Sequence, residues 1–325
     1  MIPAIRLAID VESGDHGYRE IILGVLAALE KLSDNIVCYL CGKKSVILSI
    51  FRELGIEESR HKKTFIIEHC PDSVEPEDVP SRVWKQKAGS PIIRCITLQR
   101  DGIVDASVSA GDTGILMSAA MFLLGRCDGN PRPALAALLP TIGSLPTLLL
   151  DVGANLSCRA DHLISFATMG YSYYQENFSI PNPQVALLNI GREPEKGTAS
   201  IRAAADALAL SCRGFSGFCE GTDILSGTHH VIVCDGFTGN ALLKTCESFH
   251  TLIETVCAPK KELFASINEM LTILNSENYG AVPFLGINGV VLKAHGRSNE
   301  KAIARAVRTA AAAGAHAKPF VYAVR

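Results

Sequence analysis

The sequence predicts an α/β protein in which strands and helices alternate along the chain. The clearest unit is residues 231–247, VIVCDGFTGNALLKTCE, where an apolar β-branched run leads into a polar glycine loop and then into apolar residues at helical spacing. Further apolar runs that predict strands lie at residues 104–108, 148–150 and 185–188, and they end in small polar loops at 109–114, 151–155 and 189–191. This repeated order is typical of an open sheet with parallel strands.

The loops of these units are the expected ligand site. In an open α/β sheet the carboxyl ends of the strands meet at one edge, and ligands bind in the crevice outside that edge. A helix that begins there directs free N–H groups and the positive end of its dipole into the crevice. We therefore expect an anion the size of phosphate, held by the backbone amides of Gly236, Thr238, Gly239 and Asn240.

The other elements follow from the same periodicities. Strands are predicted at residues 5–9, 36–40, 64–68 and 290–293, and helices at 45–54, 112–124, 161–170, 198–210 and from Glu300 onward. The first helix follows Asp15 and His16, so Asp15 is its expected N-cap, and Ser298 is that of the last helix. Asp10, Asp15 and His16 either face the sheet edge together, or Asp15 serves only as a cap. The uncharged run 133–150 is split by prolines and a glycine, which argues against a spanning helix.

Composition excludes several classes of protein. The 325 residues can bury a sizeable core, as one α/β domain over residues 1–325 or as two lobes. A net charge of −2 argues against bulk binding of nucleic acid. Eleven cysteines without an export signal fit reduced thiols in the cytoplasm. For Cys38 and Cys41, which form a CxxC pair, core packing is favoured over metal or redox use.

Two stretches suggest contact with partners. Residues 249–278 lose the alternating rhythm and predict two projecting helices, broken at Ala258-Pro259, whose apolar side chains suit a partner subunit or peripheral contact with the membrane. Subunit packing is favoured because the stretch has few basic residues. A second stretch carries Arg82, Lys85, Lys87 and Arg94. These form either a solvated face or a dock for an acidic partner.

Common nucleotide and nucleophile motifs are missing. No two glycines are spaced as GxG, so the dinucleotide fingerprint is absent, and Gly42-Lys43-Lys44-Ser45 lacks the upstream glycine of a P-loop. Residues 217–221, GFCEG, resemble a nucleophile elbow, but no apolar strand precedes them directly. Cys219 is therefore expected to be structural.

Seven segments together resemble one family, the phosphate acyltransferases known as PlsX, which make acyl phosphate from acyl-acyl carrier protein. They are SAGDTG from Ser109, RPALAALLPT from Arg132, LLDVGAN from Leu149, LLNIGREPEKG from Leu187, EGTDI from Glu220, VCDGFTGNALLK from Val233 and FLGINGVVLKAHGRSN from Phe284. The chain departs from the family pattern at Val11-Glu12-Ser13 and at Asp112.

The resemblance implies a three-layer α/β/α fold similar to phosphate acetyltransferase and isocitrate dehydrogenase, in a homodimer. It also implies that inorganic phosphate attacks the thioester of acyl-acyl carrier protein in an early step of phospholipid synthesis, with no cofactor and no metal. Because the carrier protein is acidic, the basic cluster becomes its expected dock. The alternatives are a non-catalytic scaffold that binds acyl carrier protein, and a metal- and nicotinamide-dependent hydroxy-acid dehydrogenase.

Site residues are expected from these motifs. Asn155 and Asn189 are expected to donate to the oxyanion, Lys196 and Lys244 to supply positive charge, Asn240 to contact phosphate, and His295 to transfer a proton or bind an oxygen. The remaining substrate-binding candidates are Asp10, Asp15, His16, Ser109, Gly111, Thr113, Arg132, Asp151, Gly153, Gly191, Glu193, Asp235, Gly236, Thr238 and Gly239. For each asparagine, a turn or cap role is the alternative. The acyl chain is expected along the helix at 115–124 or along 249–274.

Overall fold

The computed structural model describes residues 4–33, 35–56, 64–257 and 281–315. Contacts within the chain divide it into two compact units. Unit 1 comprises residues 1–125 and 279–321, and unit 2 comprises residues 126–278 and 322–325. Whether they act as a single catalytic domain stays a prediction.

Unit 1 is built on a mainly parallel sheet with the strand order β3-β2-β1-β4-β11-β10. Its strands are β1 (Ile5–Asp10), β2 (Ile36–Gly42), β3 (Phe65–His69), β4 (Ala106–Ser109), β10 (Ala281–Leu285) and β11 (Val290–Ala294). Neighbours are parallel except β10, which runs antiparallel to β11. The carboxyl ends of β1, β4 and β11 consequently share one edge.

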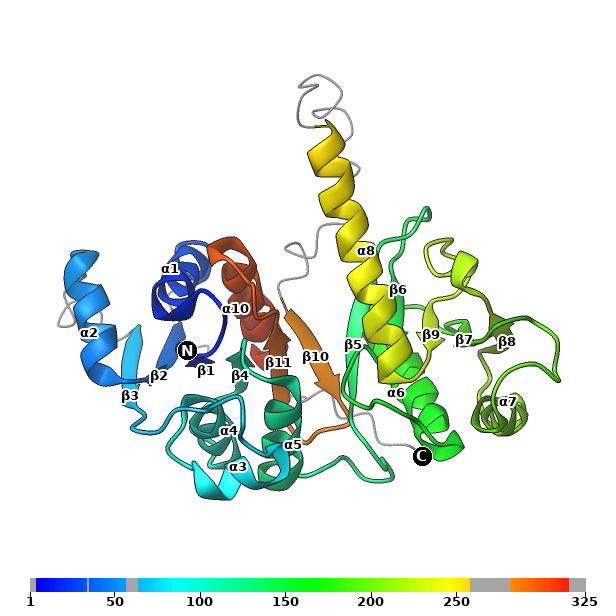
Figure 1. Cartoon of the computed structure of the whole chain (residues 1–325), viewed down its shortest axis with the longest axis horizontal. Helices are drawn as coiled ribbons and strands as arrows, with labels where there is room; N and C mark the ends of the chain where they lie inside the picture. Colours follow the sequence, from blue (N-terminus) through cyan, green and yellow to red (C-terminus); the bar gives the residue numbers. More distant parts are fainter. Residues whose placement is uncertain (1–3, 34, 57–63, 258–280, 316–325) are drawn as a thin grey trace. The chain divides into compact units, whose positions relative to one another are not determined.

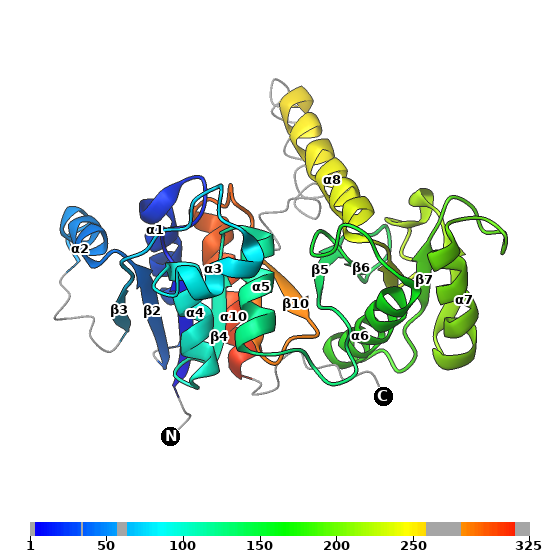
Figure 2. The ribbon, with the colours of Figure 1, turned by 60° about the horizontal axis from the view of Figure 1, so that its bottom comes forward.

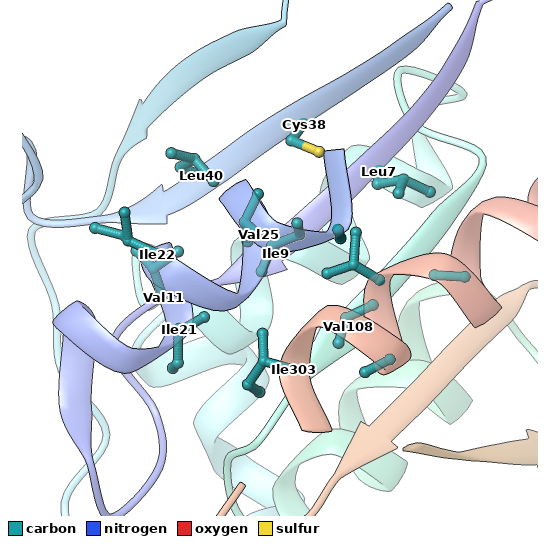
Figure 3. Packing of buried hydrophobic residues seen from close by; sticks show 14 of the residues in the cluster. Leu7, Ile9, Val11, Ile21, Ile22, Val25, Cys38, Leu40, Val108 and Ile303 are labelled. Atoms are coloured by element: carbon teal, nitrogen blue, oxygen red, sulfur yellow. The ribbon is translucent and has the colours of Figure 1, made fainter. Parts of the chain in front are cut away.

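Helices cover both faces of this sheet, so unit 1 has three layers (Figures 1 and 2). They are α1 (Gly17–Leu29), α2 (Lys44–Glu53), α3 (Pro80–Gln86), α4 (Pro91–Arg100), α5 (Thr113–Leu123) and α10 (Glu300–Ala315). On one face, α1 and α10 bury a core that includes Ile9 and Ile303 (Figure 3). These two helices approach closely at Gly24, where an added Cβ would lie 2.6 Å from the Cβ of Ile303. On the other face, Cys95 and Leu98 of α4 pack on the sheet.

In unit 2 the strands of the sheet follow the order β5-β6-β9-β7-β8. The strands are β5 (Ala134–Leu139), β6 (Thr147–Leu150), β7 (Val185–Leu188), β8 (Phe215–Cys219) and β9 (Val231–Val233), and the helices are α6 (Ala160–Phe178), α7 (Ala199–Ser211) and α8 (Gly236–Cys257), with a short 3-10 turn η1 (Gly221–Asp223). Only β5 is antiparallel to its neighbour within this sheet. As in unit 1, the parallel strands end at one edge.

The predicted α/β class is confirmed, and the strand at residues 185–188 has the predicted bounds. The uncharged run 133–150 forms β5 and β6 rather than a helix. No helix in the described ranges is long and apolar enough to cross a bilayer. Cys38 and Cys41 are free thiols buried in β2, which agrees with a packing role.

Two predicted helix caps are wrong. Helix α1 begins at Gly17 with His16 at the N-cap position and no side-chain cap, because Asp15 lies one residue too early. At the start of α10, the side chain of Asn299 accepts a hydrogen bond from the amide of Ala302 (3.0 Å). Asn299 therefore replaces Ser298 as the cap, and the Ser298 hydroxyl is buried without a partner.

Candidate active site

The loop after β6 is organised by one buried carboxylate, Asp151. Its oxygens accept hydrogen bonds from the amides of Leu135 (2.9 Å), Gly153 (3.2 Å), Ala154 (3.0 Å) and Asn155 (2.7 Å). Burial raises the pKa of Asp151, and these hydrogen bonds act against that shift. Gly153 has a backbone φ of +135°, a conformation that residues with a side chain rarely adopt. Asp151 thus orients the loop, and its predicted contact with substrate stays a prediction.

Asn155 is held inside this loop and has no hydrogen left to donate. Its side-chain nitrogen donates to the carbonyl of Pro133 and to Asp151, both at 2.8 Å. Because a side-chain amide has two hydrogens, both are used. The expectation that Asn155 donates to an oxyanion is therefore wrong for this geometry, and its turn role is favoured. Its side-chain oxygen is buried without a partner.

The amides at the start of α8 are also engaged within the chain. Asp235 caps the helix, accepting from the amide (2.8 Å) and hydroxyl (3.1 Å) of Thr238. The amide of Gly236 donates to the carbonyl of Asn155 (2.7 Å), and that of Gly239 donates to the carbonyl of Asp235 (2.9 Å). The predicted contacts from these three amides to phosphate are thus replaced by contacts within the protein.

The loop after β7 holds a second buried amide, Asn189. Its nitrogen donates to the carbonyl of Lys196 (3.1 Å), and its oxygen is buried without a partner. Among the described residues, no acceptor takes the second hydrogen of this side-chain amide. Asn189 can therefore donate one further hydrogen bond, for example to a ligand. Nearby, Lys196 and Glu193 form an exposed ion pair at 2.9 Å, which raises the pKa of Lys196 and lowers that of Glu193. Gly191 makes room, because an added Cβ would lie 2.5 Å from Lys196.

These loops enclose one pocket of about 450 Å³ at the carboxyl ends of β7 and β9. Its polar lining includes Asn189, Thr198, Ser200, Asp235 and Thr238. Its apolar lining includes Leu163, Leu188, Ile190, Ile201, Val233 and Leu242. We call it the loop pocket. The loop pocket brings together three of the predicted site residues, Asn189, Asp235 and Thr238.

The first turn of α7 lines the loop pocket, and sequence analysis missed its role. Thr198 caps this helix by accepting from the amide of Ile201 (3.3 Å). The amides of Ala199 and Ser200 have no acceptor inside the helix, as in any first turn. The signal in the sequence is Gly197-Thr198 directly before a helical pattern.

The other predicted residues of unit 2 are exposed. Asn240 lies beside Gly153, whose ideal Cβ position is 3.7 Å from the Asn240 side chain. Lys244 pairs with Glu247 at 2.8 Å on the outer side of α8, away from the lining of the loop pocket. Arg132 is near enough for its charge to oppose the rise in the pKa of Cys158, a residue that lines the pocket.

Unit 1 carries the remaining predicted residues at its own sheet edge. Asp10, which is buried, accepts from the amides of Glu12 (3.2 Å) and Ser13 (3.1 Å) and from the hydroxyl of Ser109 (2.7 Å). Burial raises the pKa of Asp10. The Ser109 hydroxyl in turn accepts from the amide of Gly111 (3.0 Å). Asp10 and Ser109 therefore shape the loops after β1 and β4.

The loop after β11 joins this edge. The amide of Asp15 donates to the carbonyl of Gly296 (2.8 Å), and His295 accepts from the amide of Arg297 (3.0 Å). Thr113 is the first residue of α5, whose N-cap is Asp112. The predicted site residues thus form two groups, one in each unit.

Comparison with known proteins gives the family. Residues 5–319 match the family model described as "Fatty acid synthesis protein". The chain is 36% identical over 318 residues to a phosphate acyltransferase of Dictyoglomus turgidum, covering 94% of this chain and 93% of that protein. It is 38% identical over 317 residues to a phosphate acyltransferase of Thermoanaerobacter pseudethanolicus, covering 94% and 92%.

The fold has relatives among solved structures. A phosphotransacetylase from Streptococcus pyogenes superposes with a TM-score of 0.64 at 14% identity, covering 96% of this chain and 95% of that one. At this identity the likeness concerns the fold alone, and it agrees with the expected similarity to phosphate acetyltransferase. The family model matches nearly the whole chain, and both phosphate acyltransferases are more than 30% identical to it. The chain therefore belongs to the phosphate acyltransferase family of fatty acid synthesis proteins.

Proposed function

We propose that this chain transfers the acyl group of acyl-acyl carrier protein to inorganic phosphate. A phosphate oxygen attacks the carbonyl carbon of the thioester, and the bond from that carbon to sulfur breaks. The products are acyl phosphate and the carrier thiol, which takes the proton that phosphate loses. The observation that carries the proposal is the loop pocket, which combines the first turn of a helix with an apolar wall.

Phosphate is placed at the N-terminus of α7 in this proposal rather than at that of α8. Helix α8 already has the carboxylate of Asp235 at its first turn. A second anion there would be repelled, and the helix dipole is already compensated. Helix α7 is capped by the neutral hydroxyl of Thr198, so its dipole and first amides remain available to an anion.

Three side chains are given roles around this anion. Lys196 supplies positive charge when its ammonium group leaves Glu193 and pairs with phosphate instead. Breaking the pair with Glu193 costs little, because an exposed ion pair contributes little stability. Asn189 donates its remaining hydrogen to the oxygen of the tetrahedral intermediate. Asn240, on the exposed side of the first turn of α8, contacts substrate there. Lys244 and His295 keep their roles as predictions from the family resemblance alone.

The reaction is tested by the release of free thiol from long-chain acyl-acyl carrier protein, with and without inorganic phosphate. We expect release only with phosphate, in equal amount to the acyl phosphate formed. Carrier binding without release would favour the scaffold. A change in nicotinamide absorbance with a hydroxy acid and divalent metal would favour the dehydrogenase, which the family match does not support.

Substitutions in unit 2 separate catalysis from stability. Lys196→Ala and Asn240→Ala are each expected to lower turnover at least about tenfold, because each removes an interaction with reacting groups. Both side chains are exposed, so Tm should change little. Arg213→Ala, which removes another exposed cation of unit 2, is the control and should keep full turnover. A large fall in Tm would reassign Lys196 or Asn240 to structure.

The basic cluster expected to dock the carrier is smaller than the sequence suggested. Lys87 pairs with Asp78 at 2.6 Å, and Arg94 pairs with Glu68 at 2.7 Å. Arg82 and Lys85 of α3 remain exposed. Between them, Trp84 stacks on the half-exposed Phe122 of α5, with ring centroids 4.9 Å apart. Because exposed aromatic rings beside cations are common in binding hot spots, we assign the carrier dock to α3.

Charge reversal tests this dock. Arg82→Glu combined with Lys85→Glu is expected to raise KM for acyl-acyl carrier protein about tenfold and to reduce its dependence on salt. Turnover of an acyl-pantetheine thioester, which lacks the carrier protein, should not change. The control reverses Lys31 and Arg52, two exposed cations of the same unit. Equal losses with both substrates would contradict docking at α3.

We also propose that α8 packs on a second copy of the chain. Its C-terminal half extends beyond the sheet of unit 2 (Figures 1 and 2) and exposes Phe249, Leu252 and Val256, which lie on one helical stripe. The rest of the predicted 249–278 segment lies outside the described residues. Leu252→Asp is expected to convert a sedimenting dimer to monomer. Wild-type protein that sediments as a monomer and binds vesicles would favour the membrane instead.

A further inference from the structure

The helices first expected to hold the acyl chain use their apolar side chains elsewhere. In α5, Ile115 and Leu116 are buried in the packing of unit 1, with 3% and 1% exposed. The described part of the second candidate, Phe249 and onward, is exposed and lines none of the large described cavities. Ile115 also lines a cavity of about 650 Å³ in unit 1, but the side chains around it are largely polar and include Glu12, Glu75 and Asp112. Among the described residues, neither helix therefore offers an apolar channel for a chain of methylene groups.

The loop pocket offers such a surface. Its apolar wall is assembled from several elements, which include α6 with Leu163, β9 with Val233, α7 with Ile201 and α8 with Leu242. A volume of about 450 Å³ falls in the usual range for small-molecule sites, which are largely apolar with a few polar groups. The polar groups here come from the loops assigned to phosphate.

The two cysteines of the wall behave as apolar groups. Burial raises the pKa of Cys158 to about 12 and that of Cys234 well above its usual value. Both are therefore neutral thiols, which are poor nucleophiles and pack like small hydrophobic side chains. A covalent acyl-cysteine has no support at this site, whereas a non-covalent apolar contact does.

One apolar side chain of the lining reaches solvent. Ile190 lines the pocket and is 80% exposed. It extends the apolar wall outward from Leu188, the residue at the end of β7 that also lines the pocket.

We propose that the loop pocket binds the acyl chain of the substrate, with its carbonyl end at the first turn of α7. This inference rests on the proposed function. The occupant follows from continuity, because the apolar wall begins where Asn189 and Thr198 supply polar contacts. A saturated chain needs no polar partner and matches the wall, while the thioester carbonyl meets the polar end. The pocket thereby selects long-chain thioesters over short ones.

A chain-length comparison tests the proposal. Leu242→Trp fills the pocket, so it is expected to lower kcat/KM for palmitoyl-acyl carrier protein at least about tenfold more than kcat/KM for the butyryl substrate. The matched control is Leu243→Trp, the next residue of α8, which is equally half-buried but does not line the pocket. The control should keep the wild-type ratio of the two substrates.

Other outcomes overturn the proposal. If palmitoyl and butyryl substrates lose activity equally, Leu242 supports the reaction centre and not the chain. If Leu242→Trp changes the activity with neither substrate, the chain binds elsewhere, including against a second copy. Binding of the fluorescent fatty acid cis-parinaric acid gives a readout independent of turnover, and Leu242→Trp should weaken it where Leu243→Trp does not. If wild-type protein binds this probe but transfers no acyl group, the proposed function fails while the pocket stands.

Discussion

The arrangement of unit 2 depends on a single buried carboxylate, that of Asp151. Because four backbone amides converge on it, the loop after β6 cannot move without leaving a charge unpaired in the core. The same loop seats α8. An added Cβ at Gly239 would lie 1.9 Å from the carbonyl oxygen of Asp151, so only glycine permits this approach. The position of α8, and with it one wall of the loop pocket, follows from Asp151.

The two helices that begin at this edge differ in how they are capped, and in our proposal this difference decides where phosphate binds. A charged cap compensates the dipole of α8, whereas a neutral cap leaves that of α7 uncompensated. A sequence pattern shows both helix starts equally well. It does not show which amides are already used, because that depends on loops brought together by the fold.

The sequence predicted elements well where local pattern and burial agree, as in the strand at residues 185–188 and the helix after Thr198. It failed at caps, because Asp15 and Ser298 each lie one residue outside the N-cap position. It also missed β8, whose two glycine-flanked phenylalanines do not read as an apolar run. For the site, motif residues did gather at the strand ends. The donor role of Asn155 could not be judged, since Pro133 and Asp151 occupy its hydrogens only in three dimensions.

Placing the phosphate and the acyl chain in one pocket has a consequence for the chemistry. Attack requires the phosphate oxygen and the carbonyl carbon to be held at near-contact distance, and fixing both partners can lower the barrier by roughly 7–11 kcal/mol in favourable cases. The wall and the first turn of α7 belong to the same unit, and Ile201 contributes to both. In the proposed complex, the apolar contact that orients the chain acts on the same unit as the amides that would hold phosphate. The α7 turn would then both select the substrate and position it for attack.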